Sequence, residues 1–137
     1  MSRAGDVSPE DAYAVLRDDP DAVLVDVRTT AEWSYVGLPD LSGLDKQVVT
    51  IEWQTFPSGA RNDAFLEQLR ASGVAEGASL YFLCRSGIRS AAAADLTTAQ
   101  GLGPAYNVRD GFEGPHDAEG HRSVAGWKAV GLPWRQG

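Results

Sequence analysis

Short apolar runs alternate along this chain with segments that have helical spacing, and this alternation constrains the fold more than any other feature. The runs occupy residues 22–27, 47–53, 78–83 and 105–108. Runs of this length, bounded by turn residues, are typical of strands buried on both faces, as the strands of a parallel sheet are. We therefore predict a strand in each run.

The segments between these runs begin with residues that favour helix starts. Ser8 can cap a helix that has Pro9 at its first position and that ends in the acidic turn at residues 18–21. Further helices are predicted at residues 29–35, 62–73 and 86–100, with a closing helix at residues 127–129. Strands that alternate with helices predict an α/β fold in one domain over residues 1–137, with a central, mostly parallel sheet flanked by helices on both faces.

The size and charge of the chain restrict its partners. Its 137 residues are the length of one domain, and its net charge of −7 argues against nucleic acid or an anionic membrane surface as a partner. No apolar run approaches the roughly eighteen residues that a membrane span needs. We therefore expect no nucleic-acid partner and no membrane partner.

Cysteine usage and the first residues indicate a compartment. The chain has one cysteine, so it can form neither an intramolecular disulfide nor a zinc cluster of thiolates. A free thiol suits a reducing compartment, and the N-terminal residues lead into no apolar segment of the kind that a secretory signal contains. We predict a cytoplasmic protein.

The single cysteine, Cys84, directly follows the predicted strand at residues 78–83, and a helix is predicted to begin within a few residues. In open α/β sheets, ligands bind outside the carboxyl ends of the strands, and N–H groups at a helix start point into such a loop. Arg85 and Arg89 add positive charge, and Gly87 lets N–H groups turn inward as in an anion-binding nest. Because this environment stabilises a thiolate, we predict a nucleophilic Cys84 in a cup for an anion.

The residues around Cys84 are assigned to two groups. The predicted contacts to an anionic substrate are Arg85, Ser86, Gly87, Ile88 and Arg89. Asp26, Arg28 and Ser90 are predicted to support the loop from behind, Ser90 through its hydroxyl. Asp26 is either an acceptor that orients the loop or a turn residue before the next helix. Arg28 is predicted to pair with Glu32, four residues further on.

Three sets of residues also have plainer interpretations. A lone cysteine is more often a small buried hydrophobic residue, but the strand end and the two arginines favour a reactive role here. Residues 116–121 contain both histidines and two acidic residues, yet nothing fixes a ligand geometry, so we predict a polar loop and no metal site. The four tryptophans are predicted to be packing residues.

Four segments together resemble the rhodanese-homology family of sulfurtransferases over nearly the whole chain. Cys-Arg-Ser-Gly-Ile-Arg at residues 84–89 resembles the six-residue active-site loop of that family. Supporting likenesses are the Asp-Val-Arg and Glu-Trp steps within residues 26–33, Asp-Gly-Phe at residues 110–112, and the Trp and Gly-Leu-Pro within residues 127–133. The chain departs from the family at residues 35–40, which lack the histidine that is common there.

The resemblance implies a two-step mechanism that requires no organic cofactor and no metal. Cys84 would attack the outer sulfur of a donor such as thiosulfate and become a persulfide held by the loop N–H groups. A thiol or cyanide acceptor, including a thiol on another protein, would then remove that sulfur. Arg85 and Arg89 would hold the small anionic donor, and a loop this basic favours a thiosulfate-like donor over mercaptopyruvate.

Two alternative functions remain open. Related cysteine phosphatases and arsenate reductases use a Cys-x5-Arg loop, whereas here Ser90 stands six places after Cys84 and Arg89 comes one place early. Since phosphoryl transfer needs a correctly aimed arginine, this alternative is disfavoured. The other alternative is a non-catalytic or sulfur-relay module that acts on a partner protein. The intact Cys84 argues against a module that has lost its nucleophile, but it is compatible with a relay.

Overall fold

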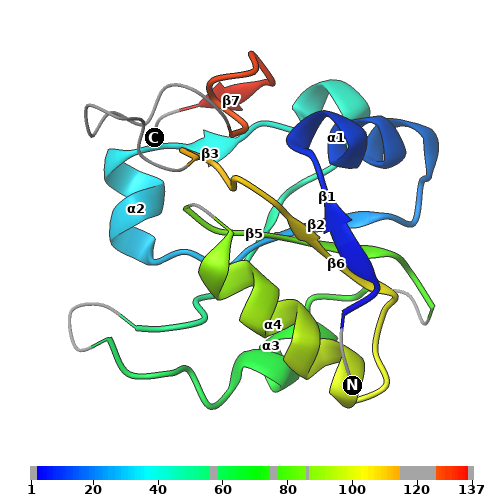
Figure 1. Ribbon diagram of the computed structural model, residues 1–137, viewed down its shortest axis with the longest axis vertical. Coiled ribbons are helices and arrows are strands. Elements are labelled where there is room, and N and C mark those ends of the chain that lie inside the picture. Colours follow the sequence, from blue (N-terminus) through cyan, green and yellow to red (C-terminus); the bar gives the residue numbers. More distant parts are fainter. Residues whose placement is uncertain (1–2, 56–58, 75–76, 86, 115–125, 136–137) are drawn as a thin grey trace.

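The structure is a computed structural model, and it describes residues 3–55, 59–74, 77–85, 87–114 and 126–135 (Figure 1). Its centre is a five-stranded sheet in the order β1-β6-β5-β2-β4, and each neighbouring pair of strands is parallel. The strands are β1 (Gly5–Val7), β2 (Val23–Asp26), β4 (Val49–Thr50), β5 (Leu80–Leu83) and β6 (Ala105–Val108). The predicted α/β class with a mostly parallel sheet is confirmed.

Helices cover both faces of this sheet (Figure 1). They are α1 (Pro9–Asp18), α2 (Thr30–Tyr35), α3 (Phe65–Ala71) and α4 (Ile88–Ala99). Helix α1 packs Ala12 and Leu16 into a core that also contains Leu83 of β5. On the opposite face, α3 and α4 pack against Phe82 and Cys84 in a second core. Because side chains of a strand alternate between faces, β5 and the residue after it contribute to both cores.

Two helix starts have side-chain caps, and the one at Ser8 is the predicted cap. The Ser8 side chain accepts a hydrogen bond from Asp11 N at 3.1 Å, before Pro9 in the first turn of α1. Thr29 and Glu32 form a reciprocal capping box at the start of α2. The predicted helix at residues 62–73 is shorter, and Asn62 Oδ1 accepts from Ala64 N at 3.1 Å just before α3 begins. The helix after Cys84 begins at Ile88 rather than at residue 86.

Several elements differ from the sequence prediction. The strand predicted at residues 47–53 is confined to Val49–Thr50 at the sheet edge. The closing helix predicted at residues 127–129 is wrong, because these residues form turns. The edge strand β1 was not predicted, since Gly-Asp-Val has no apolar run.

A small second sheet was also not predicted. It pairs β3 (Leu38–Pro39) with β7 (Trp134–Arg135) in antiparallel orientation, next to a short 3-10 turn at Ser42–Leu44. The two strands are far apart in sequence, so no local pattern announces their pairing. No helix within the described ranges is long and apolar enough to cross a membrane.

Candidate active site

Cys84 lies directly after β5, on the face covered by α3 and α4, and only 1% of its surface is exposed. Gly87 N donates a hydrogen bond to its Sγ atom at 3.1 Å. The twelve-residue helix α4 begins at the next residue, Ile88, so the positive end of the helix dipole faces the sulfur. The sulfur thus lies between the end of β5 and the N-terminus of α4, the position that the sequence predicts for Cys84.

Backbone hydrogen bonds attach the cysteine loop to the segment after β6. Phe112 N donates to Cys84 O at 2.8 Å, and the N–H groups of Glu113 and Gly114 donate to Arg85 O at 3.0 and 3.1 Å. Gly111 makes this approach possible. Its φ is +60°, and a Cβ atom there would lie 2.5 Å from Cys84 O and 2.7 Å from Arg85 O. Only glycine therefore fits at this position without a shift of the backbone.

Ser90, in the first turn of α4, lies behind the sulfur and is fully buried. Its Oγ atom is 3.2 Å from Cys84 Sγ and 2.5 Å from Oδ1 of Asn107, which is in β6 and 5% exposed. The hydroxyl predicted to support the loop is therefore in contact with the sulfur. It also connects Cys84 to a residue of the neighbouring strand.

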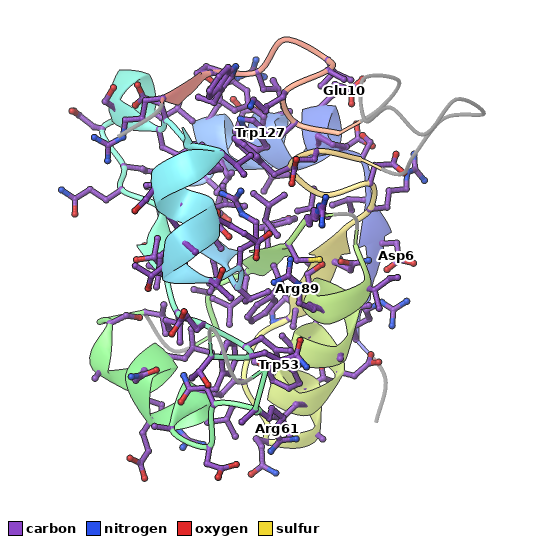
Figure 2. The ribbon with its side chains drawn as sticks, turned by 90° about the vertical axis from the view of Figure 1, so that its left-hand side faces the viewer. Asp6, Glu10, Trp53, Arg61, Arg89 and Trp127 are labelled. Carbon is purple, nitrogen blue, oxygen red and sulfur yellow. The ribbon has the colours of Figure 1, made fainter. Side chains whose placement is uncertain are left out.

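The Arg89 guanidinium binds a carboxylate. Its Nη1 and Nη2 atoms donate to Oε1 and Oε2 of Glu32 at 2.7 and 2.9 Å, which joins α4 to α2 in a bidentate pair. Burial by itself would raise the pKa of Glu32, but the hydrogen bonds and charge of Arg89, helped by Thr29 N, outweigh burial and lower it. The same partner raises the pKa of Arg89. Figure 2 shows Arg89 at the start of α4, at the middle of the molecule.

Arg85 and Ile88 face outward. The Arg85 side chain is 47% exposed, and its Nε atom lies 3.1 Å from Oε2 of Glu113. Ile88, the first residue of α4, is 79% exposed. Two cavities of about 420 and 440 Å³ both include Thr50 of β4 in their lining, and Cys84 lines neither of them.

The predicted pairing of Arg28 with Glu32 is wrong. Arg28 pairs with Asp26 instead, and both side chains are completely buried. Arg28 Nη2 donates to Asp26 Oδ2 at 2.7 Å and to Gly37 O at 2.6 Å, and its guanidinium lies 4.3 Å from the Phe112 ring centroid. Four-residue spacing brings side chains together only within a helix, and Arg28 precedes the start of α2.

The carboxylate of Asp26 also serves the turn after β2. It accepts Arg28 N at 3.1 Å as well as the Arg28 side chain. This hydrogen bond fits the interpretation of Asp26 as a turn residue. Phe112, which stacks on the guanidinium, donates its N–H to Cys84 O, so the buried ion pair supports the loop through one further residue.

Two predictions concern residues outside the described part of the chain. The first is the substrate contact predicted for Ser86, and the second is the polar loop predicted at residues 116–121, which include both histidines. Among the described residues, no group of three or more histidine, cysteine, aspartate or glutamate side chains is arranged to hold a metal ion.

The tryptophans are packed to different degrees. Trp127 is completely buried, and Trp53 is 7% exposed in the core with Phe65. Trp134 is 41% exposed, with its ring against Phe112 and with Lys128 Nζ 3.9 Å from its centroid. Trp53 and Trp127 are therefore packing residues, as predicted, whereas Trp134 is only partly packed.

For three residues of the site, the sequence did not predict the observed contacts. Asn107 had a detectable signal, because it is a polar residue within a short buried strand, and buried polar groups require partners. Glu32 was noticed but given the wrong partner, since Arg89 is 57 positions away. Gly111 was noticed only for its likeness to a family motif, and its approach to Cys84 O requires the tertiary structure.

The fold and the site together define a class of protein: a parallel α/β domain with a cysteine loop between a central strand and the next helix. A sequence profile of the STR4 middle domain matches residues 4–137 of this chain. Rhodanese-like domain-containing protein 4 from the chloroplast of Arabidopsis thaliana is 34% identical over 93% of this chain, which corresponds to 25% of that protein. The chain belongs to the rhodanese-like family.

One further relative and two solved structures are also similar to this chain. An uncharacterised protein of Rickettsia conorii is 40% identical over 90% of this chain and 91% of its own length. The crystal structure of Rv0390 from M. tuberculosis superposes with a TM-score of 0.91 and 57% identity, covering 99% of this chain and all of that one. The polysulfide-sulfur transferase of Wolinella succinogenes shares the fold, with a TM-score of 0.63 and 23% identity over 96% of this chain and 78% of that one.

Proposed function

We propose that this protein is a sulfurtransferase that carries a sulfane sulfur on Cys84 as a persulfide. The observation that carries the proposal is the Gly87 N–H, aimed at the Cys84 sulfur at the N-terminus of α4. A sulfur placed there gains a hydrogen bond and the helix dipole whenever it bears negative charge. The likeness to rhodanese-like proteins over the whole domain supports the same chemistry.

The proposed reaction has two displacement steps. In the first, the Cys84 thiolate attacks the outer sulfur of thiosulfate. A new S–S bond forms, the S–S bond of thiosulfate breaks, and sulfite leaves with the electron pair. In the second, a thiol or cyanide attacks the outer sulfur of the persulfide, takes it, and the Cys84 thiolate leaves. The site needs only to bind a sulfur donor and then a nucleophilic acceptor, and to stabilise sulfur anions.

The donor is proposed to be a small anion such as thiosulfate. Of the two arginine side chains in the loop, that of Arg85 is the more exposed. Arg89 makes two hydrogen bonds to Glu32. We therefore propose that Arg85 and the loop N–H groups contact the donor directly. Arg89 contributes its charge from within its ion pair. A catalytic thiol of this kind suits a reducing compartment, so we place the activity in the cytoplasm.

The experiment is a turnover assay with thiosulfate and cyanide that measures sulfite and thiocyanate separately. The wild-type protein should release both, with thiocyanate formed only in the second step. Cys84→Ser should abolish both products, because an alcohol cannot replace the thiolate as the sulfur carrier. Unaltered circular dichroism would show that the variant is folded. Thiocyanate release by folded Cys84→Ser would contradict the mechanism.

A second candidate function, sulfur relay to a partner protein, is favoured by Ile88. This side chain is 79% exposed at the first residue of α4, and the preceding residue, Gly87, donates its N–H to the sulfur. An exposed apolar side chain at this position can contact an apolar surface of a partner. In a relay, the acceptor is a cysteine of another protein, and cyanide is a poor substitute for it. Efficient loading by thiosulfate with slow thiocyanate formation would distinguish the relay from a turnover enzyme.

A further inference from the structure

Both arginines of the cysteine loop are paired with a carboxylate from another part of the chain. Arg89 Nη1 and Nη2 donate to Glu32 of α2 at 2.7 and 2.9 Å. Arg85 Nε lies 3.1 Å from Oε2 of Glu113, which follows β6. Each of these two positive charges is therefore balanced by a negative charge that is tethered within the same chain.

The two ion pairs differ in how easily an anion can open them. The side chains of Arg89 and Glu32 are 22% and 20% exposed, and two hydrogen bonds join them. The Arg85 side chain is 47% exposed, so a dissolved anion can reach its guanidinium. An ion pair with such an exposed member contributes little free energy, because water solvates both charges when they separate. The Arg85–Glu113 pair is therefore the one that an anionic substrate can open.

The backbone holds Glu113 next to the guanidinium for which it competes. Glu113 N and Gly114 N donate to Arg85 O at 3.0 and 3.1 Å. Gly111 allows this approach, since a Cβ atom there would lie 2.7 Å from Arg85 O. Because a tethered group has a high effective concentration, the Glu113 carboxylate returns to Arg85 whenever no other anion is bound there.

This arrangement has a consequence for an anion that approaches Cys84. An anion that binds Arg85 has to take the place of a carboxylate that is already there. Thiosulfate, a dianion, is attracted strongly enough to do so, whereas a neutral reagent does not compete for the guanidinium at all. When sulfite leaves after the first displacement step, the Glu113 carboxylate takes Arg85 back, which favours release of the sulfite.

We propose that Glu113 is a specificity-determining residue whose carboxylate competes with small anions for Arg85, and so weakens the binding of an anionic donor and favours the release of an anionic product. The part that concerns donor and product rests on the proposed function, whereas the competition for Arg85 does not. Glu113 acts only through Arg85 and contacts no reacting atom.

The test compares alkylation of Cys84 in the full-length protein by iodoacetate, an anion, and by iodoacetamide, a neutral reagent of similar size. Both reagents react with the thiolate, so the ratio of their rates at one pH does not depend on how much thiolate is present. Glu113→Gln removes the competing charge and leaves the backbone hydrogen bonds to Arg85 in place. We expect the ratio of iodoacetate to iodoacetamide rates to rise about threefold. The rise should vanish when Glu113→Gln is made in an Arg85→Ala protein.

Asp110→Asn is the matched control for the loss of one negative charge near the loop. Asp110 also follows β6, and its N atom is 3.4 Å from a Cβ atom built at Gly87. The carboxylate paired with Arg85, however, is that of Glu113. Asparagine tolerates the φ of +67° at this position, so the backbone is kept. The ratio should rise clearly less than in Glu113→Gln, because only a screened repulsion is removed.

Turnover with thiosulfate and cyanide extends the test to the donor and the product. Glu113→Gln should lower the KM for thiosulfate about threefold and should strengthen inhibition by added sulfite by a similar factor. In the Arg85→Ala protein, Glu113→Gln should change neither quantity. Glu113→Ala removes the same charge and should give the same results, so either variant decides the matter if the other does not fold.

Four results would overturn the proposal. The first is an unchanged or lowered alkylation ratio in folded Glu113→Gln or Glu113→Ala. The second is an equal rise in Asp110→Asn, which would show a general effect of charge. The third is a rise that persists in the Arg85→Ala protein. The fourth, a raised ratio with an unchanged KM for thiosulfate, overturns the part that concerns the donor. Absence of sulfur transfer in the wild type would contradict the proposed function instead, and the alkylation ratio would still test Glu113.

Discussion

The cysteine loop has a floor and a rim that are built by different means. The floor consists of the buried residues Cys84, Ser90 and Asn107, and the rim consists of the exposed residues Arg85 and Ile88. Short hydrogen bonds connect the floor residues to one another, and backbone bonds anchor the loop. The rim makes one ion pair at its edge. From this contrast we propose that the floor sets the sulfur chemistry, whereas the rim sets the choice of donor and partner.

The largest effect should come from Gly111→Ala, which disturbs the backbone contact that holds the cysteine loop. The added Cβ would lie 2.5 Å from Cys84 O at a φ of +60°, so strain and overlap act together. We expect a loss of about 3 kcal/mol or more in the free energy of unfolding, and a loss of Cys84 reactivity. Chemical denaturation measures the first and alkylation measures the second.

Gly101→Ala is the control variant, because it introduces backbone strain without steric overlap. Gly101 has a φ of +77°, but no atom lies within 4 Å of a Cβ built there. This variant should lose only about 1 kcal/mol and should keep full Cys84 reactivity. Equal losses in the two variants would mean that the approach of Gly111 to Cys84 O does not matter.

An intermediate effect is expected at the ion pair between Glu32 and Arg89. Glu32→Gln removes the charge that Arg89 binds at 2.7 and 2.9 Å, and should lower the free energy of unfolding by about 1–2 kcal/mol at neutral pH. Because Arg89 lowers the Glu32 pKa, the pair stabilises the fold above the ordinary glutamate pKa, and this stabilisation is lost as the pH falls through the lowered value.

The pH profile of stability tests that sign. Melting curves of wild type and Glu32→Gln should differ at neutral pH and converge on acidification well below about pH 4. Glu10→Gln is the control, since Glu10 is an exposed glutamate in the first turn of α1. A gap between wild type and Glu32→Gln that stays constant down to acidic pH would argue against the ion pair as its cause.

The smallest effect should come from the rim. Arg85→Ala removes an exposed guanidinium that already has Glu113 as a partner, so the loss should be about 1 kcal/mol in donor use, or about fivefold in kcat/KM for thiosulfate. The loss should appear in KM, with stability unchanged, and Arg85→Lys should restore most of it. Unchanged thiosulfate kinetics in Arg85→Ala would show that Arg85 does not contact the donor.

The cysteine loop and its contacts with distant segments differ in how far the sequence predicts them. The buried strands at Val23–Asp26 and Leu80–Leu83 follow from their apolar runs, and the position of Cys84 follows from the strand end. The loop, and with it the residues of the rim, could therefore be located without a structure. Local propensity suffices here because the loop and its flanking elements are contiguous in sequence.

The remaining contacts depend on pairings between distant segments. Asp6 meets Asn107 only because β1 and β6 are parallel neighbours in register, and the three residues of β1 carry no strand pattern. Glu32 meets Arg89 because α2 and the start of α4 come together at the same end of the sheet. Such contacts are set by topology, and one sequence contains no signal for them.

The most direct test of the central claim is the intact mass of the protein before and after thiosulfate, with and without dithiothreitol, beside Cys84→Ser. The account predicts a gain of the mass of one sulfur atom in the wild type, removed by the reductant and absent in the variant. No gain in the wild type, or the same gain in Cys84→Ser, would contradict a persulfide on Cys84.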